Sequence, residues 1–141
     1  MTSPENCDYC NKENIDWRSI TKGPLATSFV SNPRFREGQC LVIPNRHVTR
    51  IEELDEAEAS SIMLELGRLS IRLDDGFGSG IMQKYQPLQA ENGVKTNHLH
   101  FHVFPRLENE VGLFPVPDPN SFDGFERAST DEIIDLAESL K

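Results

Sequence analysis

Short apolar runs of strand length are separated by turn residues along this chain. They cover residues 25–30, 39–43, 80–85 and 98–104, and the second and the last of them stop at a proline. Proline donates no ladder hydrogen bond and therefore suits the end of a strand. We expect these four segments to be strands of one sheet, with residues 86–97 as a loop.

One long amphipathic helix is predicted between the second and third of these segments. It begins near Leu54 or Asp55, and acidic residues crowd its first turn, where the helix dipole favours them. Its apolar residues recur at helical spacing as Ile62, Leu66, Leu69 and Leu73. Strands, one long helix and further strands together indicate an α+β fold with a mostly antiparallel sheet of about five strands.

The C-terminal part, residues 111–141, has a different pattern. Three prolines between 111 and 125 predict an irregular arm, and Ser-Thr-Asp-Glu at 129–132 resembles a capping box for a short helix that ends at Leu140. A chain of 141 residues suits one hydrophobic core. We therefore expect residues 1–110 and the C-terminal part to form a single domain.

Composition narrows the class of protein. The formal charge of −9 opposes binding to long nucleic acid. Any anion that the protein binds should therefore be small and bound at a local site. No apolar run approaches the ~20 residues that a membrane span needs, and the first residues lack the layout of a signal peptide. Three cysteines without an export signal favour the reducing cytoplasm and thiols used for metal or redox chemistry.

The segment His-Leu-His-Phe-His-Val-Phe, residues 98–104, is the most unusual stretch of the sequence. Three of the four histidines alternate with apolar residues there. Side chains alternate between the two faces of a strand, so His98, His100 and His102 should share one face, with neighbours ~6.6 Å apart. The three apolar residues between them should pack on the helix.

Four interpretations of this strand are open. The histidines could lie on an exposed strand face, or be buried in the core with each imidazole hydrogen-bonded to a partner. They could hold zinc, since a strand His-x-His pair suits chelation. One imidazole could instead attack an electrophile while its neighbours orient it and move protons.

Residues 98–104 have the form His-φ-His-φ-His-φ-φ, where φ is an apolar residue, and so resemble the histidine-triad family of nucleotide hydrolases and transferases. Pro105-Arg106 and the glycine-led strand, proline and histidine of residues 38–47 are also similar to that family. The resemblance covers roughly residues 7–106. It implies a homodimer and substrates that are nucleotides modified at the α-phosphate, such as phosphoramidates, dinucleoside polyphosphates or nucleotide sugars.

The resemblance also implies roles for the histidines. His100, the middle one, would attack the α-phosphorus and form a covalent nucleotidyl intermediate. His102 would donate to a phosphate oxygen or protonate the leaving group. A carbonyl or carboxylate should hold the Nδ1–H of His100 and fix its tautomer.

Cys7-x-x-Cys10 alone is a weak motif that could be incidental or a redox pair. Some members of the family join such a pair to the histidine after the strand–proline element and to the first triad histidine, which are His47 and His98 here. Two thiolates and two imidazoles suit structural zinc, and a closed shell of four ligands leaves no position for substrate. Cys40 is expected to be a core thiol.

Two departures from the family pattern concern substrate binding. The Gly-Gln-(Ser/Thr)-Val segment before the triad lacks its glutamine, and Gln86, Lys95 and Thr96 are the candidates to replace it. Lys95 could equally be a solvated loop charge. The family also has an acidic residue that binds ribose, and Ser31 or Asn32 stands in its place here.

Three functions therefore stand at this point. The first is a nucleotide hydrolase or transferase with a covalent intermediate on His100. The second is a zinc metalloenzyme that uses the triad as metal ligands. The third is a nucleotide-binding protein of the same fold without catalytic activity.

Overall fold

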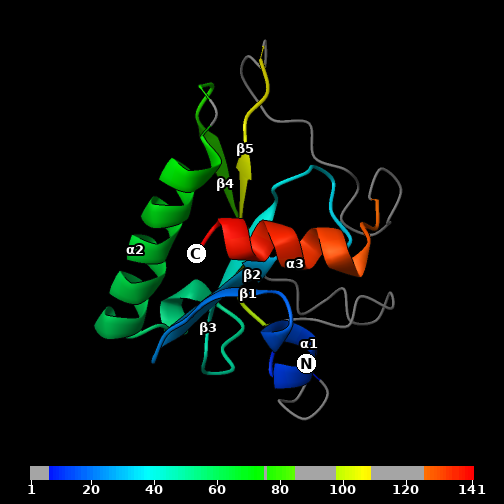
Figure 1. Ribbon diagram of the computed structural model, residues 1–141. Coiled ribbons are helices and arrows are strands. Elements are labelled where there is room, and N and C mark those ends of the chain that lie inside the picture. Colours follow the sequence, from blue (N-terminus) through cyan, green and yellow to red (C-terminus); the bar gives the residue numbers. More distant parts are fainter. Residues whose placement is uncertain (1–6, 75, 85–97, 109–125) are drawn as a thin grey trace.

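The computed structural model describes residues 7–74, 76–84, 98–108 and 126–141 (Figure 1). The predicted loop over 86–97 and the predicted arm over 111–125 lie outside the described residues. The described part has the α+β architecture expected from the sequence.

A five-stranded antiparallel sheet forms the centre of the molecule, with strand order β1-β2-β3-β5-β4. Its strands are β1 Ser19–Lys22, β2 Ala26–Val30, β3 Cys40–Pro44, β4 Ser79–Lys84 and β5 His100–Pro105. The four predicted strands are confirmed within two residues at each end. β5 begins two residues later than predicted because the Leu99 backbone N–H donates to the carbonyl of Val48, beyond the end of β3, at 2.8 Å.

Helix α2, Glu56–Leu73, is the predicted long helix and packs on one face of the sheet (Figure 1). The Asp55 side chain accepts from the backbone N–H of Glu58, whose own side chain accepts from the N–H of Asp55, which completes a capping box. The predicted apolar stripe is buried against the sheet. The core includes Ile62, Leu66, Leu69 and Leu73 from α2, Val42 from β3, and Leu99, Phe101 and Val103 from the triad segment.

Two short elements near the N-terminus were not predicted. They are α1, Lys12–Asp16, and the edge strand β1; a single-turn 3-10 helix, η2, also covers Ile51–Glu53. α1 buries only Ile15, and β1 buries only Ile20, so neither shows a hydrophobic period. β1 is stabilised by pairing with β2 and by Ile20 in the core that α2 covers, and α1 by Ile15 in a smaller cluster with Phe29.

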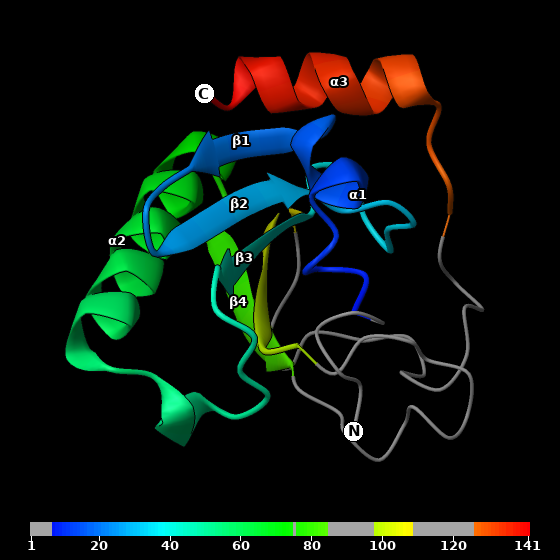
Figure 2. The same ribbon diagram turned by 90° about the horizontal axis from the view of Figure 1, so that it is seen from below.

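Helix α3, Thr130–Ser139, confirms the predicted C-terminal helix. Ser129 caps it, because its hydroxyl accepts from the backbone N–H of Glu132. Figure 2 shows α3 beside β1, at the edge of the sheet, and its residues Ile133 and Ala137 enter the core that α2 covers. Arg68 of α2 donates to the carbonyl of Leu140 at 2.9 Å, which ties the end of the chain to that helix.

A buried arginine joins the C-terminal segment to the connector between β2 and β3. Arg34 donates from Nε to Glu126 and from Nη2 to Glu132, at 3.0 and 2.9 Å. Its backbone also pairs with that of Glu126 in an isolated bridge. The described helices include none that is both long and apolar enough to cross a membrane.

The packing of α2 yields a stability prediction. Leu66 is 2% exposed in the core, whereas Leu64 is 75% exposed on the same helix. Leu66→Ala should lower the free energy of unfolding by about 2–5 kcal/mol, because it removes buried methyl groups and leaves a cavity. Leu64→Ala should change it by less than about 0.5 kcal/mol. Urea unfolding followed by circular dichroism measures both, and similar losses would contradict the assigned face.

Candidate active site and metal centre

The face of the sheet opposite α2 carries the chemically active side chains. A small apolar cluster there contains Ile15, Phe29, Leu41 and Ile43, with Tyr9 packed against it. His102 lies opposite Leu41 in the register of β3 and β5. His100 and His102 share this face, as the alternation of the strand predicts.

His98 is fully buried and is held away from the other two histidines. Its Nε2 lies 2.8 Å from the carbonyl oxygen of Pro44. A carbonyl only accepts, so Nε2 carries the proton and Nδ1 has the lone pair. That Nδ1 lies 3.5 Å from the Sγ atoms of both Cys7 and Cys10. Burial, followed by the nearby His47, lowers the pKa of His98 to about 4, which keeps the ring neutral.

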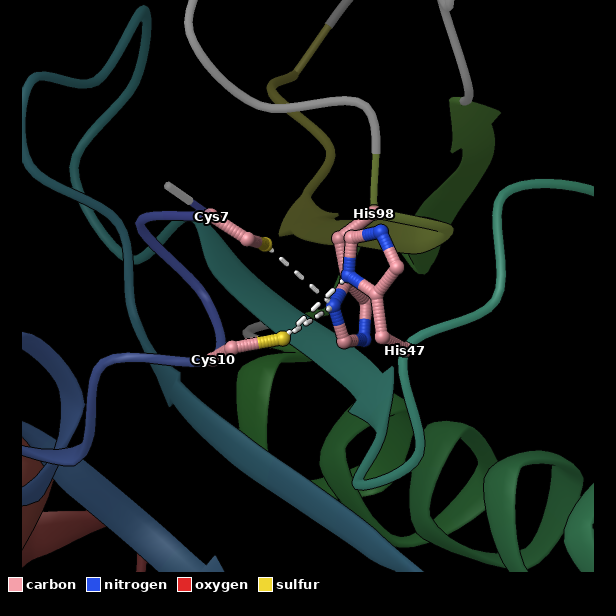
Figure 3. Close-up of side chains that lie close together, drawn as sticks. All are labelled: Cys7, Cys10, His47 and His98. Atoms are coloured by element: carbon pink, nitrogen blue, oxygen red, sulfur yellow. Dashed lines mark hydrogen bonds between the residues drawn. The ribbon is translucent and has the colours of Figure 1, made fainter. Parts of the chain in front are cut away.

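His47 completes a group of four ligands. Its Nδ1 lies 3.2 Å from the Sγ of Cys10, and its ring centroid lies 5.2 Å from that of His98. The preceding residue, Arg46, donates to Glu58 of α2 at 2.7 Å, which fixes the loop that carries His47. Figure 3 shows the four side chains directed toward one another, and their ligand atoms all lie within 4.8 Å.

The spacing of these atoms fits a tetrahedral metal ion. Zinc bonds of ~2.3 Å to sulfur and ~2.05 Å to nitrogen at the tetrahedral angle place the two ligand atoms ~3.6 Å apart, close to the observed 3.2–3.5 Å. Burial and the adjacent Cys7 raise the pKa of Cys10 to about 12, so the thiol needs a bound cation to ionise. The four residues therefore could hold a metal ion.

Cys40 has a different environment from the other two cysteines. It is fully buried in the α2 core, and its Sγ lies 3.3 Å from the carbonyl of Gly38. Burial raises its pKa to about 12. The expectation of a core thiol is confirmed.

His100 has a fixed tautomer. Its Nδ1 lies 2.7 Å from the carbonyl oxygen of His98, so Nδ1 carries the proton and Nε2 has the lone pair. The carbonyl partner expected from the sequence is thus present. The ring of Tyr9 contacts that of His100 edge-on, with centroids 5.2 Å apart and an interplanar angle of 89°.

Two residues at this site were missed from the sequence. Tyr9 lies between the two cysteines of the motif and touches Phe29, His98 and His100. Gln39 lies 2.9 Å from His102, through its Nε2 and the ring Nδ1. The only signal for Gln39 was a polar residue at the start of a buried strand, and nothing local links it to a residue 63 positions away.

The predicted substrate contacts have separate outcomes. The Asn32 side chain makes two hydrogen bonds with Ala128, donating to its carbonyl at 3.4 Å and accepting from its N–H at 3.0 Å. A role for Asn32 toward substrate stays a prediction. Gln86, Lys95 and Thr96 lie outside the described residues, so their roles also stay predictions.

An open cavity of about 510 Å³ lies on this side of the sheet and borders Tyr9. Its volume falls in the range of small-molecule pockets. Ile43 lines it together with Lys12, Lys22 and Asp16. Lys22 pairs with Asp16 at 3.7 Å, so the charged side chains of the lining add up to one positive charge.

Comparison with known proteins gives the same family as the motifs. The model of the HIT domain matches residues 12–109. An adenosine 5'-monophosphoramidase from Schizosaccharomyces pombe is 23% identical over 113 residues, which cover 77% of this chain and 80% of the relative. A bis(5'-adenosyl)-triphosphatase from Dictyostelium discoideum is 29% identical over 104 residues, with 67% and 68% covered.

Solved structures show the same fold. A hypothetical protein from Leishmania major superimposes with a TM-score of 0.65 at 21% identity, covering 96% of this chain and 94% of the other. A zinc-bound histidine-triad family protein from Mycobacterium smegmatis has a TM-score of 0.63 at 16% identity, with 98% and 97% covered.

Proposed function

This chain belongs to the HIT domain family, and on that basis we propose that it is a hydrolase or transferase of nucleotide conjugates. The bond that it breaks joins the α-phosphorus to its leaving group, as in a nucleoside phosphoramidate or a dinucleoside polyphosphate. Two relatives with names of this kind support the substrate class. The observation that carries the proposal is the hydrogen bond from His100 Nδ1 to the carbonyl of His98, which puts the proton on Nδ1 and the lone pair on Nε2, the atom that would attack phosphorus.

The proposed reaction has two steps. In the first, the Nε2 lone pair of His100 forms a bond to the α-phosphorus, and the bond from phosphorus to the leaving nitrogen or oxygen breaks with its electron pair. The leaving atom takes a proton from water, and His102, whose ring centroid lies 5.2 Å from that of His100, donates a hydrogen bond to it or to a phosphate oxygen. In the second, the oxygen of water or another acceptor forms a bond to phosphorus and loses its proton to solvent. The bond from phosphorus to Nε2 breaks, and its electron pair returns to His100 as the nucleotide product leaves.

The metal in this proposal is structural zinc, held by Cys7, Cys10, His47 and His98. Four protein ligands fill a tetrahedral shell, so the ion stabilises the fold and takes no substrate. The zinc-bound relative supports this identity. A site built on thiolates agrees with the reducing cytoplasm that we expect for this protein.

A catalytic metal held by the three triad histidines has less support. His98 donates from Nε2 to the Pro44 carbonyl and directs Nδ1 at Cys7 and Cys10, so both of its ring nitrogens have partners outside the triad. In the described residues, only the Cys/His group brings at least three metal-ligand atoms of these residue types together.

We further propose that two copies of the chain pair through the β4 edge of the sheet. Among the described residues, β4 has a hydrogen-bonded neighbour, β5, on one side only. Two apolar side chains are exposed at this edge, Ile81 within β4 and Phe77 just before it. An edge strand flanked by exposed apolar residues is a template for pairing with a second copy.

Activity toward adenosine 5'-phosphoramidate and diadenosine polyphosphates tests the reaction. We expect release of AMP and an acid-labile nucleotidyl label on His100 in the quenched enzyme. His100→Ala should lower kcat/KM by at least ~10³-fold, because it removes the nucleophile, whereas Leu64→Ala should match the unsubstituted protein. Nucleotide binding without turnover, unchanged in His100→Ala, would favour the non-catalytic alternative.

Metal analysis tests the zinc site. The purified protein should contain one zinc per chain, and Cys10→Ser should lose it and several kcal/mol of stability. Cys40→Ala, at the core thiol, should keep the metal. Zinc that is lost from His100→Ala but kept by Cys10→Ser would overturn this site and support the metalloenzyme.

Light scattering tests the dimer. The unsubstituted chain should have twice the 16.0 kDa mass of one copy, and Ile81→Glu should shift it toward the monomer, because a charge there is buried on pairing. Ile134→Glu places the same change on α3, at the other edge of the sheet, and should leave the dimer intact. A monomeric unsubstituted chain would contradict the proposal.

A further inference from the structure

Gln39 is a buried amide whose orientation is fixed by the main chain. It is 0% exposed, and its Oε1 lies 2.8 Å from the backbone nitrogen of Phe35. That nitrogen carries a hydrogen and only donates, so the side-chain atom that faces it is the carbonyl oxygen. The NH₂ group of Gln39 therefore faces His102.

The direction of the next hydrogen bond follows. Gln39 Nε2 lies 2.9 Å from His102 Nδ1, and an amide NH₂ only donates. The ring nitrogen accepts and is therefore unprotonated. A neutral imidazole carries one N–H, so that of His102 is on Nε2.

We infer that Gln39 is a positioning residue that holds His102 in the Nε2–H tautomer. This rests on the proposed function, in which His102 is a donor. The neighbouring His100 is held in the opposite tautomer by the His98 carbonyl, so its Nε2 has a lone pair. The two rings, 5.2 Å apart, thus present one nucleophilic nitrogen and one N–H donor on the same face. Attack on phosphorus needs this combination.

The backbone around Gln39 explains why its side chain reaches His102. By strand alternation Gln39 shares a face with Leu41, the register partner of His102. Gly38 makes the preceding turn with a φ of +88°, where a Cβ would lie 3.2 Å from Pro105. The Gln39 carbonyl accepts from the N–H of Ser31 at 2.9 Å. The Ser31 N–H thus holds the backbone of Gln39, and the Phe35 N–H holds its side-chain amide.

Gln39→Glu is a diagnostic variant because it keeps the shape of the side chain and removes the donor. Both carboxylate oxygens accept, so the bond to His102 forms only if Nδ1 carries the proton. Gln39→Leu removes the bond altogether with little change in volume. Neither variant touches the His98 carbonyl or the four Cys/His ligands.

The experiment is nitrogen NMR on the zinc-loaded full chain with ¹⁵N-histidine at pH 8. The chain has four histidines, so His102→Asn assigns the signal by difference. We expect Nε2 of His102 to be protonated and Nδ1 unprotonated, and Gln39→Glu to protonate Nδ1. A protonated Nδ1 in the unsubstituted protein, or a tautomer unchanged in Gln39→Glu, would overturn the inference.

Kinetics supply the second readout. Gln39→Leu should lower kcat by roughly ten- to a hundredfold with KM within about threefold, because binding is kept and the hydrogen bond that His102 Nε2–H donates in the transition state is weakened. The nucleotidyl label on His100 should still form, more slowly. A kcat of Gln39→Leu equal to that of the unsubstituted protein would rule out the positioning role of Gln39. If no nucleotidyl label forms on His100 in the unsubstituted protein, the proposed reaction is refuted. The NMR experiment would still test the tautomer of His102 separately.

Discussion

The site depends on one hydrogen bond, between Nδ1 of His100 and the backbone carbonyl of His98. It fixes the nitrogen that has the lone pair, and it comes from the residue whose ring belongs to the Cys/His group. The orientation of the candidate nucleophile and the geometry of the candidate metal centre are therefore both set by residues 98–100. A change in the position of His98 would move both.

Backbone carbonyls assign the roles of two of the three alternating histidines. The Pro44 carbonyl directs the Nδ1 lone pair of His98 to the cysteines, and the His98 carbonyl puts the proton of His100 on Nδ1 and its lone pair on Nε2. An amide assigns the third, through Gln39. Identical side chains at regular spacing thus differ in chemistry because each meets a different main-chain or side-chain partner.

Much of this could be predicted from the sequence, because the signals are periodic or local. The stripe of α2, its cap at Asp55 and the alternation of residues 98–104 all follow from side-chain spacing. That His98 precedes the strand β5 could not be predicted, since it depends on the backbone hydrogen bond from Leu99 to the carbonyl of Val48. The contacts of Asn32 with Ala128 likewise join residues 96 positions apart. Sequence patterns thus predict which face of a helix or strand a side chain lies on. The residue that it contacts there depends on the tertiary structure.

A crystal structure of the zinc-loaded protein with a vanadate analogue of the α-phosphate would test the division of the triad most directly. Anomalous scattering should place the metal among Cys7, Cys10, His47 and His98, and vanadium should be bonded to Nε2 of His100. A metal ion on His100, or an analogue bound away from that nitrogen, would contradict the account.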